Sequence, residues 1–229
     1  MQNFKKKGIE ILGYNINPDI IMEWKEKYYA SEVVKKNTKQ IYDKFLRILD
    51  SKAIIYNEND IRPQIDENEL IERPIWEEII KHEENKQIIG EQYWGKSVGP
   101  FGRSQLLNPN SEYYLGRAEF YPKAKEVVDI IHKAGGKAFL AHPFEYKFED
   151  TIKFIDDLIK EVELDGIECF HPSANEENMK KLVDYVRKNN LYISGGSDYH
   201  GGLKPDIEIA VGKGNLNISK DFILEWINK

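Results

Sequence analysis

The sequence predicts an α/β fold with a parallel sheet, and two observations support this prediction. From about residue 121 onward, helical and strand periods alternate regularly, as in chains built from βα units. Chemically active side chains also follow the predicted strands directly, at the edge where parallel α/β folds carry their functional sites. The 229 residues are enough for one sizeable domain or for a domain with an insertion.

The regular βα units lie in the second half of the chain. Apolar residues at helical spacing predict helices over residues 121–134, 148–162, 176–188 and 219–228. Short apolar segments predict strands over residues 137–141, 167–170, 191–194 and 207–211. Asp165-Gly166 and the glycine pair at 135–136 supply turns between these elements.

The first half is less regular. A predicted strand over residues 8–15 is followed by a long helical region, from about residue 20 to residue 50. Short helices are predicted around residues 67–84, and the polar stretch 57–68 is predicted to be a loop. Residues 90–116 have no clean period and are interpreted as a surface lid or a substrate-contacting loop.

These patterns predict the domain organisation. Residues 1–18 and 119–229 would form the α/β portion, and residues 19–118 would form a helical insertion with an irregular loop after the first strand.

Composition excludes several classes of protein. With 33 basic and 39 acidic residues, the net charge of −6 gives no support for nonspecific nucleic-acid binding. The single Cys169 excludes an intramolecular disulfide and, without an apolar signal segment, predicts a reducing cytoplasm. No apolar run approaches the roughly 18 residues that a membrane span requires. We therefore expect a globular cytoplasmic protein.

Three side chains at predicted strand ends are candidate metal ligands. His142 follows one strand, and the motif Asp198-x-His200 follows another. In extended backbone, residues two apart point the same way, so one divalent ion could use Asp198 and His200 together, with His142 as a third ligand. Such an ion lowers the pKa of bound water toward about 7 and polarises a phosphoryl oxygen.

Each candidate also has a plain structural interpretation. The proline after His142 could simply end a strand, and the segment GGSD could be an ordinary turn around Asp198. Glu168 could be a buried carboxylate held by a neighbouring lysine, and His171 could cap a loop. The residues alone leave both interpretations open.

Several segments together resemble the PHP family, the polymerase and histidinol phosphatase superfamily of metal-dependent phosphoesterases. Three of them are similar to successive family motifs: AGGKAFLAHP (134–143), LDGIECFHP (164–172) and ISGGSDYHG (193–201). IEILGYNI (9–16) is similar to the family's HILGY-type strand. The resemblance implies a partial or distorted (βα)7-type barrel that holds two or three divalent ions and hydrolyses phosphate esters.

The resemblance also implies roles for individual residues. The metal ligands would be His142, Asp198, His200 and Glu10, which stands where the family commonly has His. The cofactor would be Mn, Zn, Fe or Mg, absent or partly occupied in this chain. His171 and Glu168 lie in a family segment near the cleft and are candidates for contact with the substrate. Because a phosphate needs a cation, Arg103 and Arg117 are the candidates to bind it.

The opening motifs of the family are absent from this sequence. Family members begin with an H-x-H strand and further Asp, His and Glu motifs before the HILGY-type strand, whereas only nine residues precede Glu10 here. We therefore expect a truncated, C-terminal portion of such an enzyme, with an incomplete metal site that holds at most one ion weakly. Missing βα units would expose strand edges, which self-association could cover.

Three functional hypotheses follow. The first is a metal-dependent phosphoesterase that acts on a phosphorylated small molecule or nucleotide, without specific nucleic-acid binding and without membrane contact. The second is a noncatalytic PHP-like module that binds a phosphorylated ligand or a protein partner. The third is an amidohydrolase-like enzyme, because related barrels place His and Asp at similar strand ends.

Overall fold

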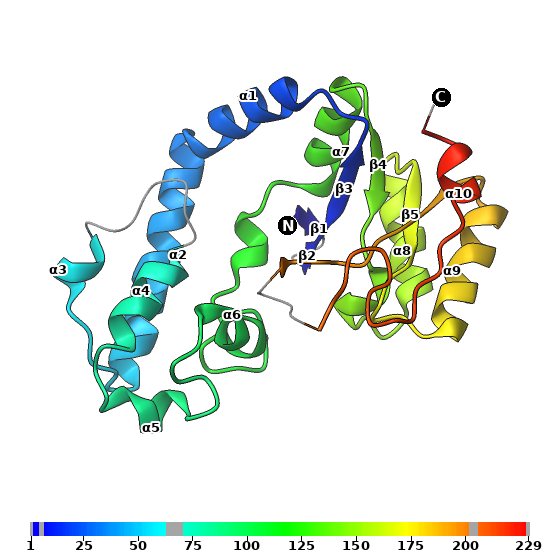
Figure 1. Cartoon of the computed structure of the whole chain (residues 1–229). Coiled ribbons are helices and arrows are strands. Elements are labelled where there is room, and N and C mark those ends of the chain that lie inside the picture. The colour runs from blue at the N-terminus through cyan, green and yellow to red at the C-terminus, as the bar shows by residue number, and fades with distance from the viewer. Residues whose placement is uncertain (1, 5–6, 63–70, 202–205, 228–229) are drawn as a thin grey trace. The chain divides into compact units, whose positions relative to one another are not determined.

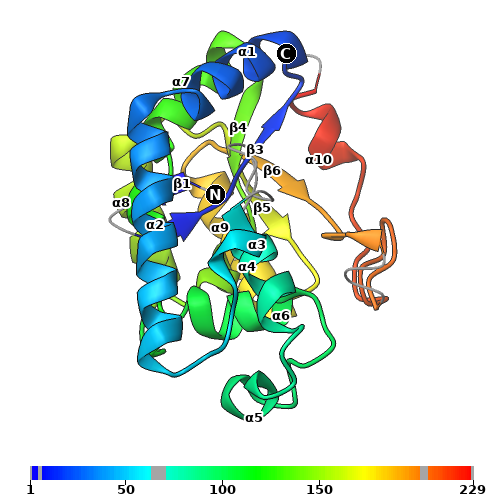
Figure 2. The ribbon, with the colours of Figure 1, turned by 90° about the vertical axis from the view of Figure 1, so that its left-hand side faces the viewer.

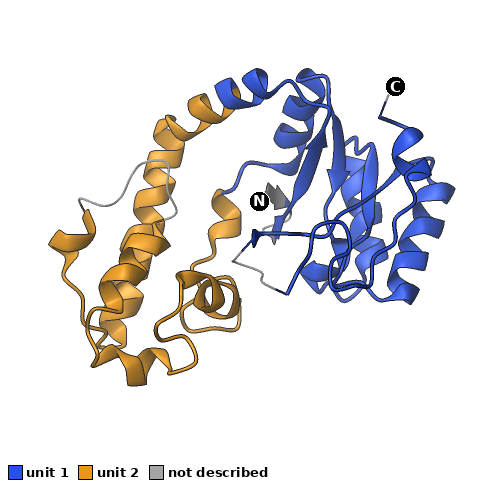
Figure 3. Ribbon diagram, viewed as in Figure 1, with its two compact units in different colours: residues 1–23, 121–229 blue, residues 24–120 orange. Residues whose placement is uncertain are grey.

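The computed structural model describes residues 2–4, 7–62, 71–201 and 206–227. It divides into two compact units, one formed by residues 1–23 and 121–229 and the other by residues 24–120 (Figure 3). The domain boundaries at residues 18 and 119 stay a prediction. No helix in the described part of the chain is long and apolar enough to cross a membrane.

The first unit is built around a four-stranded sheet in the order β3-β4-β5-β6 (Figures 1 and 2). Strand β3 (Ile11–Tyr14) runs antiparallel to β4 (Lys137–Leu140). Strands β4, β5 (Gly166–Phe170) and β6 (Tyr192–Gly195) run parallel to one another. The start of β3 therefore lies at the same edge as the carboxyl ends of the other three strands.

A second, two-stranded sheet precedes β3. It consists of β1 (Gln2–Phe4) and β2 (Lys7–Ile9), paired antiparallel. The strand predicted over residues 8–15 is thus divided at Glu10, which lies between β2 and β3. The described residues form a mixed α/β fold, and closure of the sheet into a barrel stays a prediction.

Helices alternate with the parallel strands in the predicted order. Helix α7 (Ala124–Lys133) precedes β4, α8 (Thr151–Glu161) connects β4 to β5, and α9 (Glu176–Lys188) connects β5 to β6. The side chain of Asp150 caps α8 by accepting the Lys153 N–H, and Asn175 caps α9 in the same way. Apolar faces of these helices and strands are buried, which accounts for the stability of the unit: Val128, Ile131, Phe139, Ile155, Leu158, Ile167, Val186 and Ile193.

The second unit is helical. Its elements are α2 (Glu32–Ser51), α3 (Glu58–Ile61), α4 (Glu72–Ile79), α5 (Asn85–Ile89), α6 (Val98–Phe101), a π-helix at Gly102–Leu106 and a 3-10 helix at Arg117–Phe120. Its core includes Phe45, Leu49, Trp76 and Phe101, with the rings of Trp76 and Phe101 stacked 4.8 Å apart.

The long helical region predicted over residues 20–50 is two helices. Helix α1 (Pro18–Tyr29) ends before Ser31, which begins α2. The Ser31 hydroxyl accepts the backbone N–H of Val34 and so supplies the N-cap of the second helix. The break therefore has a local cause in the capping serine.

Two elements predicted near the carboxyl terminus differ in the structure. The predicted strand over residues 207–211 is wrong, because the described residues there form only an isolated bridge between Glu208 and Gly212. Positive φ angles of 69° at Ala210 and 62° at Gly212 turn the chain back instead of extending it. The predicted helix over residues 219–228 shortens to α10 (Asp221–Leu224), and residue 228 lies outside the described residues.

Two predictions in the second unit also need correction. Helix α3 forms inside the stretch 57–68 that was predicted to be a loop, because the Asn57 side chain caps it by accepting the Asn59 N–H. The rest of that stretch from residue 63 lies outside the described residues, as do residues 67–70 of the helices predicted around 67–84. The described helix there is α4.

Candidate metal centre at the carboxyl edge of the sheet

The topology brings polar residues from four strand ends to one edge of the sheet. Glu10 precedes β3, whereas His142, His171 and Asp198 follow β4, β5 and β6. Because β3 is antiparallel to β4, Glu10 lies beside the end of β4, and its backbone carbonyl accepts the N–H of Ala141 at 3.0 Å. Residues far apart in the sequence therefore share one edge.

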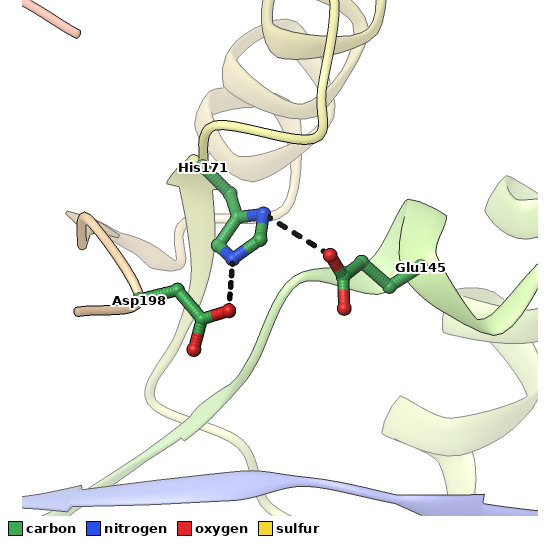
Figure 4. A group of neighbouring side chains, drawn as sticks. All are labelled: Glu145, His171 and Asp198. Atoms are coloured by element: carbon green, nitrogen blue, oxygen red, sulfur yellow. Dashed lines mark ion pairs between the residues drawn. The ribbon is translucent and has the colours of Figure 1, made fainter. Parts of the chain in front are cut away.

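Three side chains at this edge form a group that can hold a metal ion. One ligand atom from each of Glu145, His171 and Asp198 lies within 4.8 Å of the others (Figure 4). His171 Nδ1 is 3.8 Å from Glu145 Oε1, and His171 Nε2 is 3.5 Å from Asp198 Oδ2. These separations are longer than good hydrogen bonds. They involve different nitrogens of the His171 ring, and a single ion can use only one of them. An ion bound through Nε2 would share the 3.5 Å separation from Asp198, within the roughly 3 to 4 Å that two atoms ligating one ion show when each metal bond is about 2.1 Å.

Two buried imidazole nitrogens provide a test of whether a cation fits. His171 Nε2 and His142 Nδ1 are both buried and have no hydrogen-bond partner among the described residues. His142 Nδ1 is 3.9 Å from Glu145 Oε2, and the two imidazole rings are 5.1 Å apart. A buried polar atom without a partner is unfavourable, and a divalent ion held by Glu145, His171 and Asp198 would satisfy Nε2 of His171, whereas His142 lies beside this group. The residues present fit such an ion.

The other nitrogen of His171 is already engaged. Nδ1 lies 2.6 Å from the Ser173 hydroxyl and accepts the Ser173 backbone N–H at 3.2 Å. This leaves Nε2 as the nitrogen available to a metal. When Nε2 ligates a metal, the proton of the neutral ring is on Nδ1, and the Ser173 hydroxyl 2.6 Å away would accept it in place of the contact with the Ser173 N–H.

His142 is held in an unusual backbone conformation. Its φ is 27°, which is unfavourable for a residue with a side chain, and its backbone N–H donates to Glu168 Oε2 at 2.8 Å. Glu168 is buried within β5 and is therefore held by this backbone N–H rather than by the lysine that one interpretation of the sequence suggested. The contact fixes the position of the His142 backbone, from which the imidazole ring extends.

Burial and neighbouring charges shift the pKa values of these groups in different directions. Burial raises the pKa of Glu168 to about 7, although the His142 N–H opposes the shift. Burial lowers the pKa of His171, which favours the neutral imidazole that a metal requires. Burial also acts to lower the pKa of His142, but the hydrogen bond and charge of Glu10 outweigh it and the pKa is raised. The same hydrogen bond lowers the pKa of Glu10.

The structure places the remaining predicted residues as follows. His200 is half exposed, and its Nδ1 lies 2.8 Å from the backbone oxygen and 3.4 Å from Oδ1 of Asp198. Arg103 and Arg117 belong to the second unit, where Arg103 is exposed and Arg117 pairs with Glu72. The functional role of each predicted residue stays a prediction.

Sequence reasoning missed Glu145. It lies in the 3-10 helix η4 (Pro143–Tyr146) that directly follows His142. A tight turn places residues three apart on the same side, so Glu145 returns to His142. The sequence His-Pro-Phe-Glu carried this signal, because the proline favours a turn immediately after the strand.

A mixed α/β unit with histidines and carboxylates at its strand ends is typical of barrel-type hydrolases. A phosphoribosyl 1,2-cyclic phosphate 1,2-diphosphodiesterase from Eggerthella lenta is 36% identical over 81 residues, which are 35% of this chain and 29% of that protein. The 5′-3′ exoribonuclease Rnm of Escherichia coli is 32% identical over 79 residues, which are 33% of this chain and 26% of that protein. These relatives confirm the predicted resemblance to PHP-type phosphoesterases.

The matched regions are short relative to the whole relatives. A 5′-3′ exoribonuclease from Haemophilus influenzae is 31% identical over 102 residues, which are 43% of this chain and 35% of that protein. The chain thus spans between 26% and 35% of the length of the curated relatives it matches. No family model matches the chain.

Two solved structures share the fold. An amidohydrolase from Chromobacterium violaceum, with bound sulfate and no metal, has a TM-score of 0.60 and 19% identity, covering 88% of this chain and 66% of that chain. A protein described as a metal-dependent phosphoesterase from Bifidobacterium adolescentis has the same TM-score and identity, covering 97% of this chain and 72% of that chain. At this identity, the likeness establishes the mixed α/β fold.

Proposed function

We propose that the chain carries the site of a metal-dependent phosphoesterase, which hydrolyses a phosphate monoester or a nucleotide-type substrate. The observation that carries this proposal is the group Glu145, His171 and Asp198, with a buried His171 nitrogen that lacks a hydrogen-bond partner among the described residues. The names of the relatives, a diphosphodiesterase and exoribonucleases, support the reaction class.

In this proposal the ligands are Glu145, His171 Nε2 and Asp198, with His142 beside them. Two imidazoles and two carboxylates suit Mn, Zn or Fe, whereas Mg would rely mainly on the carboxylates. A divalent ion bound there supplies a water of lowered pKa and polarises a phosphoryl oxygen. The Ser173 hydroxyl orients the His171 ring, and Glu168 holds the backbone of His142.

The finer expectations belong to the same proposal. The described ligands would hold a single ion, and His200 would join as an outer ligand beside Asp198. Arg103 is the better candidate for a phosphate contact, since Arg117 already pairs with Glu72. We also propose a partial or distorted barrel-like fold, self-association of the chain, and the cytoplasmic location suggested by the lone Cys169.

The experiment removes all metal with a chelator, restores Mn²⁺ or Zn²⁺, and assays hydrolysis of a chromogenic phosphate monoester and of a short oligoribonucleotide. Asp198→Asn and His171→Gln should each lower the metal-dependent rate by at least about 100-fold, because each removes one of few ligands. Asp184→Asn is the matched control, since Asp184 is exposed on α9.

Two results would count against the proposal. Activity that survives both substitutions, or activity independent of added metal, would remove the assigned ligands from the reaction. Tight binding of a phosphorylated ligand without any turnover by the loaded chain would favour the noncatalytic module instead. Equal losses in Asp184→Asn would show that the readout reports on stability rather than on the site.

A further inference from the structure

We propose that Glu10 is a positioning residue for His142: its carboxylate accepts a hydrogen bond from His142 Nε2 and leaves Nδ1 as the nitrogen that faces the metal beside Glu145. This inference rests on the proposed metal centre. It differs from the expectation that Glu10 is itself a ligand, and the experiment below decides between the two roles.

The two nitrogens of His142 have different surroundings. Nε2 lies 3.1 Å from Glu10 Oε2, within hydrogen-bond distance, so the proton of a neutral imidazole is held there. Nδ1 is buried, has no hydrogen-bond partner among the described residues, and is 3.9 Å from Glu145 Oε2. The lone pair on Nδ1 therefore faces the carboxylate that belongs to the candidate metal group.

The position of Glu10 is set by its backbone. Its N–H donates to the Tyr146 hydroxyl at 2.7 Å, and its carbonyl accepts the Ala141 N–H at 3.0 Å. The Tyr146 hydroxyl in turn donates to the Ala141 carbonyl at 2.9 Å. These contacts tie the start of β3 to the end of β4, so the carboxylate is presented to the His142 ring by two paired strands.

His142 is thus fixed at both ends. Glu168 accepts its backbone N–H, and Glu10 accepts from its ring. A carboxylate, a histidine and a metal in series is a recurrent arrangement, in which the carboxylate fixes the tautomer and raises the basicity of the ligating nitrogen. The burial pattern favours this arrangement here, because the Glu10 side chain is 42% exposed whereas that of His142 is 11% exposed.

The test compares Glu10→Gln with Glu10→Ala by measuring Zn²⁺ affinity in competition with a chromophoric chelator. An amide oxygen still accepts a hydrogen bond from Nε2, but it is a weaker metal ligand than a carboxylate. If Glu10 positions the ring, Glu10→Ala should lower the affinity 10- to 100-fold and Glu10→Gln should remain within about threefold of the unaltered chain. Glu149→Ala, at an exposed position, is the control.

A second readout is independent of affinity. In ¹⁵N-labelled protein, Zn²⁺ should shift the Nδ1 resonance of His142 while Nε2 keeps its proton. In Glu10→Ala, the ring proton should no longer be confined to Nε2, because its acceptor is missing. Equal, large losses of affinity in both Glu10 variants, or a Zn²⁺-induced shift at Nε2, would overturn the inference and make Glu10 a ligand.

The outcomes also separate this inference from the proposed function. If the unaltered chain binds Zn²⁺ and hydrolyses phosphate esters while neither Glu10 variant changes affinity, only the positioning role fails. If the unaltered chain binds no Zn²⁺, both proposals fail. Circular dichroism and thermal melting of each variant confirm that the fold is retained before affinities are compared.

Discussion

At the amino edge of the four-stranded sheet, Asp165 has partners for both of its carboxylate oxygens. Oδ2 lies 2.7 Å from His132 Nε2 and accepts the Ala138 N–H at 2.8 Å, while Oδ1 is 3.6 Å from Lys137 Nζ. At the carboxyl edge, imidazole nitrogens of His142 and His171 are buried without hydrogen-bond partners among the described residues. Both Asp165 oxygens thus have partners at one edge of the sheet, whereas two imidazole nitrogens at the opposite edge lack hydrogen-bond partners within the described part of the chain.

Positive φ angles occur at both edges, at Asn15 and Asn190 on the amino edge and at His142 and Asp198 on the carboxyl edge. Asparagine and aspartate tolerate the left-handed region at about 57°, so His142, at 27°, is the strained position among them. Strain and missing hydrogen bonds both lower stability, and a fold retains them where a ligand or a reaction requires that arrangement. Under the proposed function, the Asp165 edge has a structural role and the carboxyl edge carries the chemistry.

Asp165→Ala should produce the largest change in stability. It leaves the N–H of fully buried Ala138 without its acceptor and removes a charge-assisted contact to His132. We expect a loss of about 3 kcal/mol in the free energy of unfolding. The melting temperature should then fall by roughly 6 to 12 °C in thermal denaturation.

Asp198→Asn is the matched variant at the opposite edge. Asparagine tolerates the left-handed conformation at φ 55°, so the variant tests the side-chain chemistry alone. In chelator, its free energy of unfolding should lie within about 1 kcal/mol of the unaltered chain. A destabilisation equal to that of Asp165→Ala would abolish the distinction between the edges.

Much of this contrast could be predicted from the sequence, but its geometry could not. Apolar strands followed by His142, His171 and Asp198 indicated which residues share an edge, because parallel strands end together. The place of Glu10 depended on an antiparallel pairing whose register no local pattern encodes. Glu145 was missed because its approach to His142 arises from a short 3-10 turn rather than from a periodic element.

A further prediction concerns the pH dependence of stability at the carboxyl edge. The pKa of Glu168 is about 7 in the folded chain, against 4.5 as its ordinary value. The folded state therefore binds more protons than the unfolded state between these values, and the Glu168 contribution to stability falls as the pH rises from about 4.5 to 7. The change should be about 2 kcal/mol, measured in chelator by urea denaturation at several pH values.

Glu168→Gln isolates this contribution. The amide oxygen can still accept the His142 N–H, but the side chain no longer titrates. The difference in unfolding free energy between the unaltered chain and the variant should therefore change with pH across this window. A difference that stays constant from pH 4.5 to 8 would show that the carboxylate is not destabilised by burial at this edge.

Tyr146→Phe should give the smallest effect on stability, and it tests the bridge between the start of β3 and the end of β4. The Tyr146 hydroxyl bridges the Glu10 N–H and the Ala141 carbonyl, so its removal leaves both groups with fewer partners while the ring remains. We expect a loss of about 1 kcal/mol in the free energy of unfolding.

Zn²⁺ affinity in Tyr146→Phe should weaken by less than in Glu10→Ala, because the Ala141 N–H still holds the Glu10 carbonyl and the carboxylate remains near His142. Phe148→Leu changes a neighbouring aromatic ring without touching this bridge and serves as the control. A Tyr146→Phe variant with unchanged stability and an affinity as low as that of Glu10→Ala would mean that the hydroxyl serves the metal centre rather than the strand pairing.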